Sequence, residues 1–122
     1  MKNCLFCKFI DNTLKTEKVY EDERMIVIRD IAPKARLHYL MIPKDHYAAL
    51  DEMDERQQAE LGKCLFRLSE LKEELDLGGG YRLIVNQGAD AGQTVGHLHV
   101  HILGGQELPF DDVSGKEKTT VG

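Results

Sequence analysis

The sequence of 122 residues contains no long hydrophobic run. No stretch approaches the roughly 20 consecutive apolar residues that a membrane-spanning helix requires. The first twelve residues, MKNCLFCKFIDN, are interrupted by polar side chains too early to form the apolar region of a signal peptide. We therefore expect a cytoplasmic protein without a membrane partner.

Cysteine is scarce as well, and basic residues are outnumbered by acidic ones. Three cysteines do not indicate a disulfide framework in a cytoplasmic chain. The net charge is −5, and the 16 Lys and Arg residues are scattered along the chain, which argues against a nucleic-acid partner. A small anionic ligand is still compatible with this charge, because backbone amides and a few cations can hold a phosphate locally.

The remaining composition is that of a single globular domain over residues 1–122. The sequence is 42% hydrophobic and 30% charged, and it contains neither an internal repeat nor a low-complexity block. The segment from about residue 106 to residue 122 is polar and rich in Gly, Lys and Thr, so we expect a loose C-terminal tail there.

The first half of the chain predicts short strands. KVYEDERMIVIRD (18–30) predicts two strands around the acidic residues 21–23, and LHYLMIPK (37–44) predicts a third. Pro43 ends this third strand, because proline supplies no ladder donor. The segment before them, CLFCKFIDN, fits a short turn or helix.

One long helix is predicted from about Asp54 to Leu75. Its apolar residues recur at steps of three and four and form one stripe, which consists of Leu61, Cys64, Leu65, Leu68, Leu71 and Leu75. Asp54 and Gln57 have the spacing of a capping box, and Asp51 is an alternative N-cap. We expect Gly78–Gly80 to end the helix and Cys64 to be a core thiol.

The second half continues with a strand at 81–85, a ten-residue loop (86–95) and the stretch TVGHLHVHILGG (94–105). So short a connection favours an antiparallel pair, because a parallel crossover needs a dozen or more residues. The element order therefore predicts an α+β domain, with an antiparallel sheet of about five strands and one long helix packed on a face.

The stretch 94–105 holds three of the five histidines in strict alternation with aliphatic residues. In a strand, His97, His99 and His101 share one face, about 6–7 Å apart, while Leu98, Val100 and Ile102 anchor the other face. Two chemistries use such a row. The histidines can hold a catalytic zinc with its activated water, or a neutral imidazole can attack an electrophile and form a covalent intermediate.

Cys4 and Cys7 form a C-x-x-C pair, which fits either two free thiols or half of a zinc site. His46, just beyond the strand that Pro43 ends, and His97 are the candidates for the other two ligands. A Cys₂His₂ set leaves no open position on zinc, so such a metal is structural. It also removes His97 from a catalytic metal site, which favours covalent catalysis by the row.

The loop NQGADAGQT (86–94) supplies two glycines, two side-chain amides and a hydroxyl next to the histidines. Loops of this kind can turn several backbone N–H groups toward one anion. The adjacency to the histidine row makes the loop a candidate phosphate site.

These residues resemble the histidine-triad (HIT) family. HLHVHIL matches the family's pattern of three alternating histidines, while NQGADAGQT and the following GG match its Hint branch. The resemblance extends through YEDERMIVIRDIAPKARLHYLMIPKDH and CLFCK, and so covers roughly residues 3–105.

The resemblance implies a homodimeric hydrolase or transferase that acts on nucleoside monophosphates carrying a leaving group. His99 would attack the α-phosphorus and become transiently nucleotidylated, and His101 and His38 would contact the phosphate. Asn86, the backbone around Gly92 and Gln93, and Thr94 would complete the phosphate site, with the Thr94 hydroxyl as a proton relay to the leaving group.

The resemblance also implies further site residues. Asp30 would bind the ribose hydroxyls, and Phe6, Ile28 and Ile31 would form the apolar slot for a purine base. The zinc-bearing members use a set that matches Cys4, Cys7, His46 and His97. Three departures concern this chain: Ile28 stands where some members have phenylalanine, Arg36 replaces a proline, and ELPFDD lacks the tryptophan of many Hint endings.

The resulting hypothesis is a hydrolase of purine nucleoside 5′-phosphoramidates with a structural zinc. The alternatives are a dinucleoside polyphosphate hydrolase or nucleotidyl transferase that uses the same His99, a metallohydrolase with zinc on the histidine row, and a nucleotide-binding interaction module.

Overall fold

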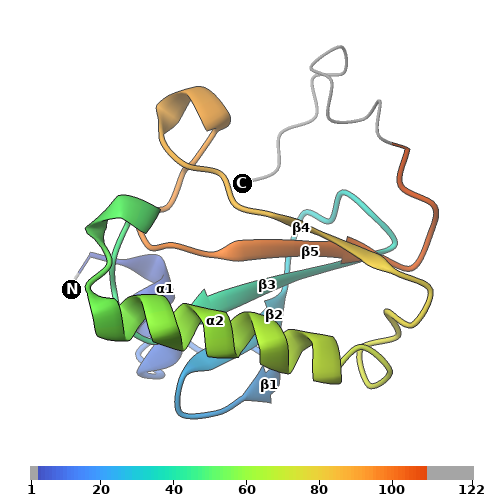
Figure 1. Ribbon diagram of the computed structural model, residues 1–122, viewed down its shortest axis with the longest axis horizontal. Coiled ribbons are helices and arrows are strands. Elements are labelled where there is room, and N and C mark those ends of the chain that lie inside the picture. The colour runs from blue at the N-terminus through green and yellow to red at the C-terminus, as the bar shows by residue number, and fades with distance from the viewer. Residues whose placement is uncertain (1–2, 110–122) are drawn as a thin grey trace.

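Five antiparallel strands form one sheet in the computed structural model, which describes residues 3–109. The strands are β1 (Lys18–Glu21), β2 (Met25–Arg29), β3 (Leu37–Pro43), β4 (Tyr81–Ile84) and β5 (Val100–Gly104), in the spatial order β1-β2-β3-β5-β4 (Figure 1). The helices are α1 (Leu5–Ile10) and α2 (Glu55–Glu70), and two 3₁₀ turns are η1 (Leu50–Glu52) and η2 (Ala89–Ala91). The expected α+β class is confirmed.

Most of the expected C-terminal tail, residues 110–122, lies outside the described residues. Within residues 3–109, none of the helices combines the length and the apolar character needed to cross a membrane.

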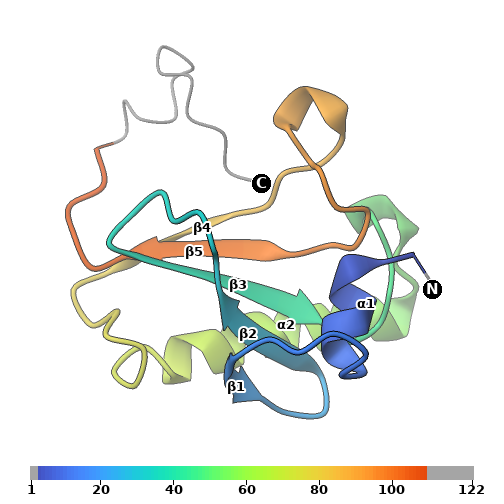
Figure 2. The same cartoon turned by 180° about the vertical axis from the view of Figure 1, so that it is seen from behind.

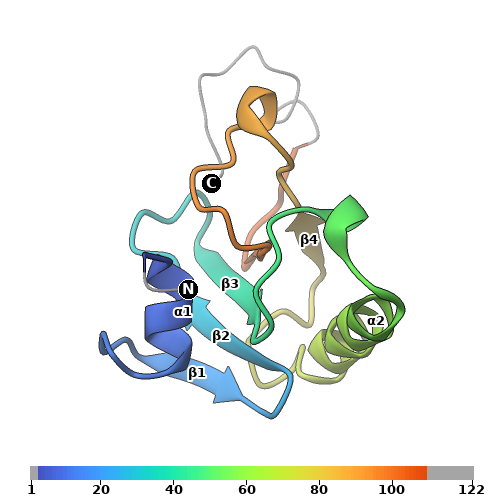
Figure 3. The same ribbon diagram turned by 90° about the vertical axis from the view of Figure 1, so that its left-hand side faces the viewer.

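The two faces of the sheet carry different side chains. On β3, Tyr39 and Met41 belong to the large core cluster under α2, whereas Leu40 and Ile42 belong to a second cluster that includes Phe6 of α1. Figures 2 and 3 accordingly show α1 and α2 on opposite sides of the sheet. His38 alternates with Tyr39 along β3, so it lies on the α1 face. That face carries the candidate site.

Helix α2 begins as expected and ends earlier. The Asp54 side chain accepts a hydrogen bond from the Gln57 amide, and the Gln57 side chain accepts one from the Asp54 amide, so the predicted capping box is confirmed. Cys64 is buried, as predicted. The helix ends at Glu70, however, and not near Leu75 or at the glycines.

The early end of α2 has a packing reason. The Leu71 amide is shared between the carbonyls of Arg67 and Leu68, which tightens the last turn. An ideal helix would place Leu75 and Leu77 about 200° apart around its axis. The turns at residues 71–76 instead bring Leu71, Leu75 and Leu77 all into the core.

Strand β5 begins at Val100, so His97 and His99 lie just before it and only His101 lies within it. The neighbouring strands explain this start. Pro43 ends β3 and has no amide to donate, and the Leu98 amide donates instead to the carbonyl of Tyr47, at 2.7 Å. The alternation still holds through this segment, because Leu98, Val100 and Ile102 all lie in the core under α2.

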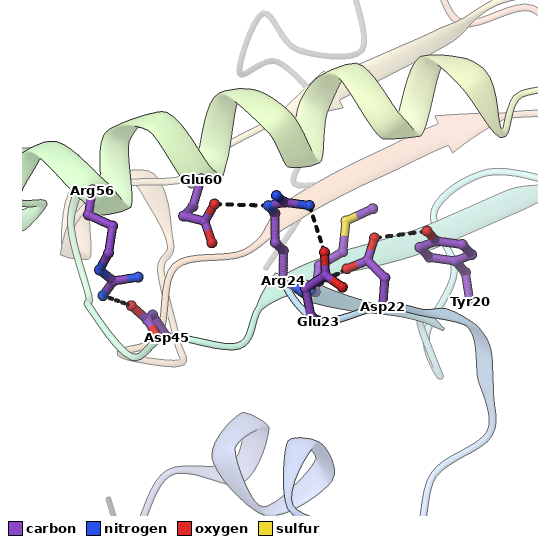
Figure 4. Close-up of polar contacts among 8 residues, drawn as sticks. Tyr20, Asp22, Glu23, Arg24, Asp45, Arg56 and Glu60 are labelled. Atoms are coloured by element: carbon purple, nitrogen blue, oxygen red, sulfur yellow. Dashed lines mark hydrogen bonds and ion pairs between the residues drawn. The ribbon is translucent and has the colours of Figure 1, made fainter.

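Polar contacts join α2 to the β1–β2 turn and to the segment that follows β3 (Figure 4). Arg24, in the β1–β2 turn, binds Glu60 of α2 at 2.8 Å and Glu23 at 3.0 Å. Arg56 of α2 pairs with Asp45, the residue before His46. Exposed ion pairs contribute little to stability, but the second pair holds the segment that carries His46 against the start of α2.

Candidate functional site

Four of the five histidines are buried on the α1 face. His38, His97, His99 and His101 each expose at most 5% of their surface. The ring of Phe6 meets the ring of His99 edge-on at 5.0 Å between centroids, and the His99 ring meets that of His101 at 5.1 Å. The alternating row is therefore a contiguous set of imidazoles against α1.

Backbone carbonyls fix the tautomers of His97 and His99. Nε2 of His97 lies 2.7 Å from the Pro43 oxygen, and Nδ1 of His99 lies 2.8 Å from the His97 oxygen. A carbonyl only accepts, so both of these nitrogens carry the proton. In a neutral ring, His97 Nδ1 and His99 Nε2 therefore keep their lone pairs.

The tautomers of His38 and His101 follow from a hydrogen-bond chain. The Lys34 amide donates to Nδ1 of His38 at 3.0 Å, so His38 carries its proton on Nε2. That Nε2 lies 2.9 Å from Nδ1 of His101, to which it donates. The proton of a neutral His101 is consequently on Nε2.

Burial keeps these rings neutral. Desolvation is the main cause that lowers the pKa of His101 to about 4, and the neighbouring His99 and His38 rings lower it further. Burial likewise lowers the pKa of His38, against the opposing effect of the Asp30 carboxylate. Both rings are uncharged near pH 7, and their N–H groups act as neutral donors.

A cavity of about 310 Å³ opens over this row. It is lined by Leu5, Phe6, Asp30, Ile31, Ala32, Lys34, His38, Leu40, Thr94, Val95, His99 and His101. Seven of the predicted residues thus meet at one cavity: the catalytic candidates His38, Thr94, His99 and His101, and the binding candidates Phe6, Asp30 and Ile31.

Two buried side-chain N–H groups have no hydrogen-bond partner among residues 3–109. They are Nε2 of His101 and Nδ2 of Asn86. Asn86 lies two residues beyond Ile84, which is the last residue of β4 and is paired with His101. Orphaned buried donors are rare in native proteins. These two are suited to an acceptor such as a phosphate oxygen.

The predicted phosphate loop is held in place by the Gln93 side chain. Its amide oxygen accepts from the Gly88 amide, and its amide nitrogen donates to the carbonyls of Ala48 and Val95. Gly92 has φ +82° and ψ +24°, a left-handed conformation that glycine adopts without strain. The Gln93 side chain is thus committed to the loop, and only its backbone is available to a ligand.

The predicted base-slot residues have three different environments. Phe6 is 5% exposed at the wall of the cavity, and Ile31 is fully exposed at its rim. Ile28 is buried in the cluster of Phe6 and Leu40 and is not one of the lining residues. Asp30 lines the cavity, with Oδ1 accepting from the Ala32 amide at 2.8 Å.

A second cluster joins Cys4, Cys7, His46 and His97, whose ligand atoms all lie within 4.8 Å of one another. Nδ1 of His97 lies 3.1 Å from Nδ1 of His46 and 3.4 Å from the Cys4 sulfur, and the Cys7 sulfur lies 3.3 Å from His46 Nδ1. Zinc bonds of 2.0–2.3 Å in a tetrahedron give ligand-to-ligand distances of about 3.3–3.8 Å. The four residues therefore fit a tetrahedral ion.

The donor atoms of the cluster also suit a cation. The lone pair of His97 faces the other ligand atoms, because its proton is committed to Pro43. Burial, with Cys4 as a further cause, raises the pKa of the Cys7 thiol to about 11. A metal ion among these atoms would stabilise the thiolates and accept both imidazole lone pairs.

Asp30, His38 and His101 form another group with metal-ligand spacing. Here the tautomers disagree with metal binding. The Lys34 amide occupies the lone pair of His38 Nδ1, and His38 Nε2 carries a proton directed at His101. This group is organised as a chain of hydrogen-bond donors, which favours covalent catalysis over a metal on the histidine row.

Several contributors carry no signal in the sequence. The Lys34 amide and the Pro43 carbonyl fix the tautomers of His38 and His97. Because both contacts use backbone atoms, they do not depend on the side chains at these positions and leave no pattern in the sequence. Leu5, Leu40 and Val95 line the cavity as ordinary aliphatic residues. Only the position of Leu5 between Cys4 and Phe6 could have suggested its place.

Comparisons with known proteins identify the family of the chain. The HIT domain model matches residues 12–108. The chain is 39% identical to protein HitA of Neisseria gonorrhoeae over 104 residues, which cover 85% of this chain and 97% of that protein.

Two solved structures are similar throughout. One is a HIT family hydrolase from Clostridium thermocellum, with TM-score 0.83 and 44% identity over 89% of this chain and 96% of that one. The other is a histidine triad nucleotide-binding protein from Candida albicans, with TM-score 0.74 and 29% identity over 92% and 90%. A family model that spans most of the chain, and relatives that it matches over nearly their whole length, establish that this protein belongs to the HIT family.

Proposed function

We propose that this protein is a nucleotide hydrolase that cleaves purine nucleoside 5′-phosphoramidates through a covalent intermediate on His99. The observation that carries the proposal is the unpartnered buried donor His101 Nε2–H in the cavity that His99 also lines, together with a second unpartnered donor, Asn86 Nδ2–H. The names of the related hydrolases and of the nucleotide-binding protein from Candida albicans support the same class of ligand.

The proposed reaction has two displacements at phosphorus. The lone pair of His99 Nε2 attacks the α-phosphorus, a P–Nε2 bond forms, and the P–N bond to the leaving amine breaks as the amine takes up a proton through the Thr94 hydroxyl. Water then attacks the same phosphorus, breaks the P–Nε2 bond and releases the nucleoside monophosphate. The charge on the phosphate oxygens is stabilised by His101 Nε2–H, Asn86 and backbone amides around Gly92 and Gln93.

The rest of the cavity suits a nucleoside. Asp30 is available to the ribose hydroxyls, and Phe6 and Ile31 offer apolar surface to the base. Ile31 at full exposure is costly to leave in water and gains from a flat ring placed against it. Ile28 packs in the same buried cluster as Phe6 and supports the base slot from behind the cavity lining.

Zinc is the proposed metal of the Cys4, Cys7, His46 and His97 cluster. Two thiolates and two imidazoles close its tetrahedral shell, so the ion would supply structural stability and no water for hydrolysis. Thiolate ligands need reduced cysteines, which accords with the cytoplasm as the proposed compartment.

A homodimer is the proposed assembly. Within residues 3–109, strand β4 pairs only with β5, and two apolar residues, Leu83 on β4 and Val85 just after it, are 40% and 37% exposed. An open edge with apolar side chains favours pairing with another strand. A second copy of this chain is the proposed partner.

The test is mass spectrometry of the intact protein after rapid mixing with adenosine 5′-phosphoramidate. Wild type should gain one adenylyl group transiently, and His99→Ala should gain none while keeping the wild-type fold by circular dichroism. An adduct on both proteins would place the nucleophile elsewhere, and turnover without any adduct would contradict the covalent route.

Comparison of turnover on the phosphoramidate and on a dinucleoside polyphosphate separates the proposed activity from the alternative activities. Faster hydrolysis of the phosphoramidate supports the proposal, and faster hydrolysis of the polyphosphate overturns the substrate class. Binding of adenosine monophosphate without cleavage of either compound would indicate a binding module.

A further inference from the structure

The metal cluster and the substrate cavity share structural elements. Cys4 is the N-cap of α1 and Cys7 lies within it, so two of the four proposed ligands flank Leu5 and Phe6, which are walls of the cavity. A neighbouring cavity of about 510 Å³ is lined by Cys4 and His46 and also by Leu5, Thr94 and Val95. The last three residues therefore line both cavities.

Helix α1 depends on contacts outside itself. It has six residues, whereas isolated helices shorter than about 12–15 residues are marginal in water. Its anchors are the packing of Phe6, Phe9 and Ile10 against the sheet and the contacts of the two cysteines with His46 and His97. A cation that joins the four ligands would therefore fix α1 to the ends of β3 and β5.

Two direct contacts lead from the cluster to His99. The Phe6 ring lies 6.0 Å from the His97 ring and 5.0 Å from the His99 ring, in edge-on contact with both. The carbonyl oxygen of His97, itself a proposed ligand, accepts the Nδ1–H of His99. One contact positions the wall beside the nucleophile, and the other holds the nucleophile's tautomer.

From this arrangement we propose that metal binding at Cys4, Cys7, His46 and His97 and nucleotide binding in the cavity are positively coupled, with Phe6 as the residue that transmits the coupling. The inference rests on the proposed function, because it takes a nucleoside monophosphate as the ligand of the cavity. Coupling between two sites is reciprocal, so the factor by which zinc tightens nucleotide binding equals the factor by which the nucleotide tightens zinc binding.

The experiment is calorimetric titration of the full-length protein with adenosine monophosphate, after chelation and dialysis and again after addition of one equivalent of Zn²⁺. We expect a Kd at least about fivefold lower with zinc, within the usual range of coupling between sites. A zinc competition titration with and without the nucleotide should return the same factor.

Two variants on one helix test the role of Phe6. In Phe6→Leu, zinc should bind as in wild type while the coupling factor falls toward one. Phe9→Leu is the matched control, because Phe9 stacks on Phe6 at 6.2 Å and not on the histidine rings, and it should keep the coupling. Cys7→Ser should bind zinc weakly and should bind the nucleotide like the metal-free wild type.

The outcomes separate the two proposals. Equal nucleotide affinity with and without zinc overturns the coupling and leaves the proposed function intact. Failure of Zn²⁺ to bind overturns the coupling together with the metal site, and it too leaves the proposed hydrolase function intact. Failure of the nucleotide to bind in either state overturns the proposed function, and the coupling with it. Coupling that survives in Phe6→Leu overturns the role of Phe6.

Discussion

At the residue scale, the site depends on where four histidine protons lie. Each ring has at least one nitrogen in a structural contact, with Pro43, His97, Lys34 or His38, and this contact decides whether the other nitrogen carries a proton or a lone pair. His97 turns a lone pair to the cysteines, His99 keeps a lone pair for attack, and His101 offers a proton to an anion. Residues of one type therefore have three different roles.

The His38–His101 contact gives a prediction at this scale. In His38→Ala, Nδ1 of His101 loses its donor, so the ring can place its proton on the wrong nitrogen. A buried polar group left without its partner costs about 1–3 kcal/mol, and we expect kcat for the phosphoramidate to fall about 5- to 150-fold. His38→Gln retains an N–H donor and should recover part of the loss. Steady-state kinetics check this, and equal rates for His38→Ala and wild type would contradict the chain of donors.

At the element scale, α2 stabilises the sheet from the face opposite the site. Its capping box and its buried stripe of Leu61, Cys64 and Leu68 contribute to folding, while the cavity is built from α1, the β2–β3 loop, β3, and β5 with the segment before it. Changes at the start of α2 should therefore separate stability from catalysis.

The N-cap provides the corresponding prediction. Asp54→Ala removes the acceptor of the Gln57 amide and should lower the free energy of unfolding by about 1 kcal/mol, with kcat and KM unchanged. Asp51→Ala, the other candidate cap in the sequence, is the control and should leave stability nearly unchanged, because Asp51 belongs to η1. Urea denaturation measures both, and a larger effect of Asp51→Ala would reverse the assignment.

Elements were predictable where the pattern is local. The period of Leu61, Cys64 and Leu68 and the spacing of Asp54 and Gln57 identify α2, and the alternation of His97 to Ile102 identifies the two faces of the segment around β5. The end of α2 and the start of β5 were not predictable, because the first depends on how Leu77 packs and the second on the missing amide of Pro43. The tautomers depend on backbone atoms from elements distant in the chain, such as Lys34 and Pro43.

At the scale of the whole molecule, the buried histidines make folding sensitive to acid. His101 has a pKa of about 4 in the folded protein against an ordinary value of 6.5, mainly because of burial. Below pH 6.5 the unfolded chain therefore binds a proton that the folded protein does not. The contribution of the neutral His101 to the free energy of unfolding is fully present above pH 6.5 and is lost as the pH falls toward 4. The lowered pKa of His38 acts in the same direction.

The size of this effect can be measured by urea denaturation in the presence of a chelator. The difference between the ordinary pKa of His101 and its pKa of about 4 in the folded protein corresponds to about 3 kcal/mol in the free energy of unfolding. We expect the free energy of unfolding to decrease from pH 7 to pH 4.5, and the decrease should be smaller in His101→Gln. A wild-type stability that stays level over this range would contradict the burial of neutral rings.

The proposed dimer gives a prediction for the assembled molecule. Leu83→Lys places a charge at the outer edge of β4 and should shift the protein toward the monomer in sedimentation equilibrium. Leu14→Lys is the matched control: Leu14 is 43% exposed, similar to Leu83, but it lies between α1 and β1 at the other end of the sheet. If only Leu14→Lys dissociates the dimer, the interface lies at the β1 end of the sheet.

The unpartnered donors of His101 and Asn86 also affect the ligand-free protein. A buried N–H without an acceptor costs about 1–3 kcal/mol, so a ligand that accepts from these donors contributes to stability. Any compound that supplies the acceptors restores this free energy, and at a concentration 100 times its Kd it should stabilise the fold by about 2.7 kcal/mol. The melting temperature can therefore be used to search for substrates. Nucleotides and their amidates should raise the Tm of wild type, and they should raise it less in Asn86→Leu, which lacks one of the two unpartnered N–H donors.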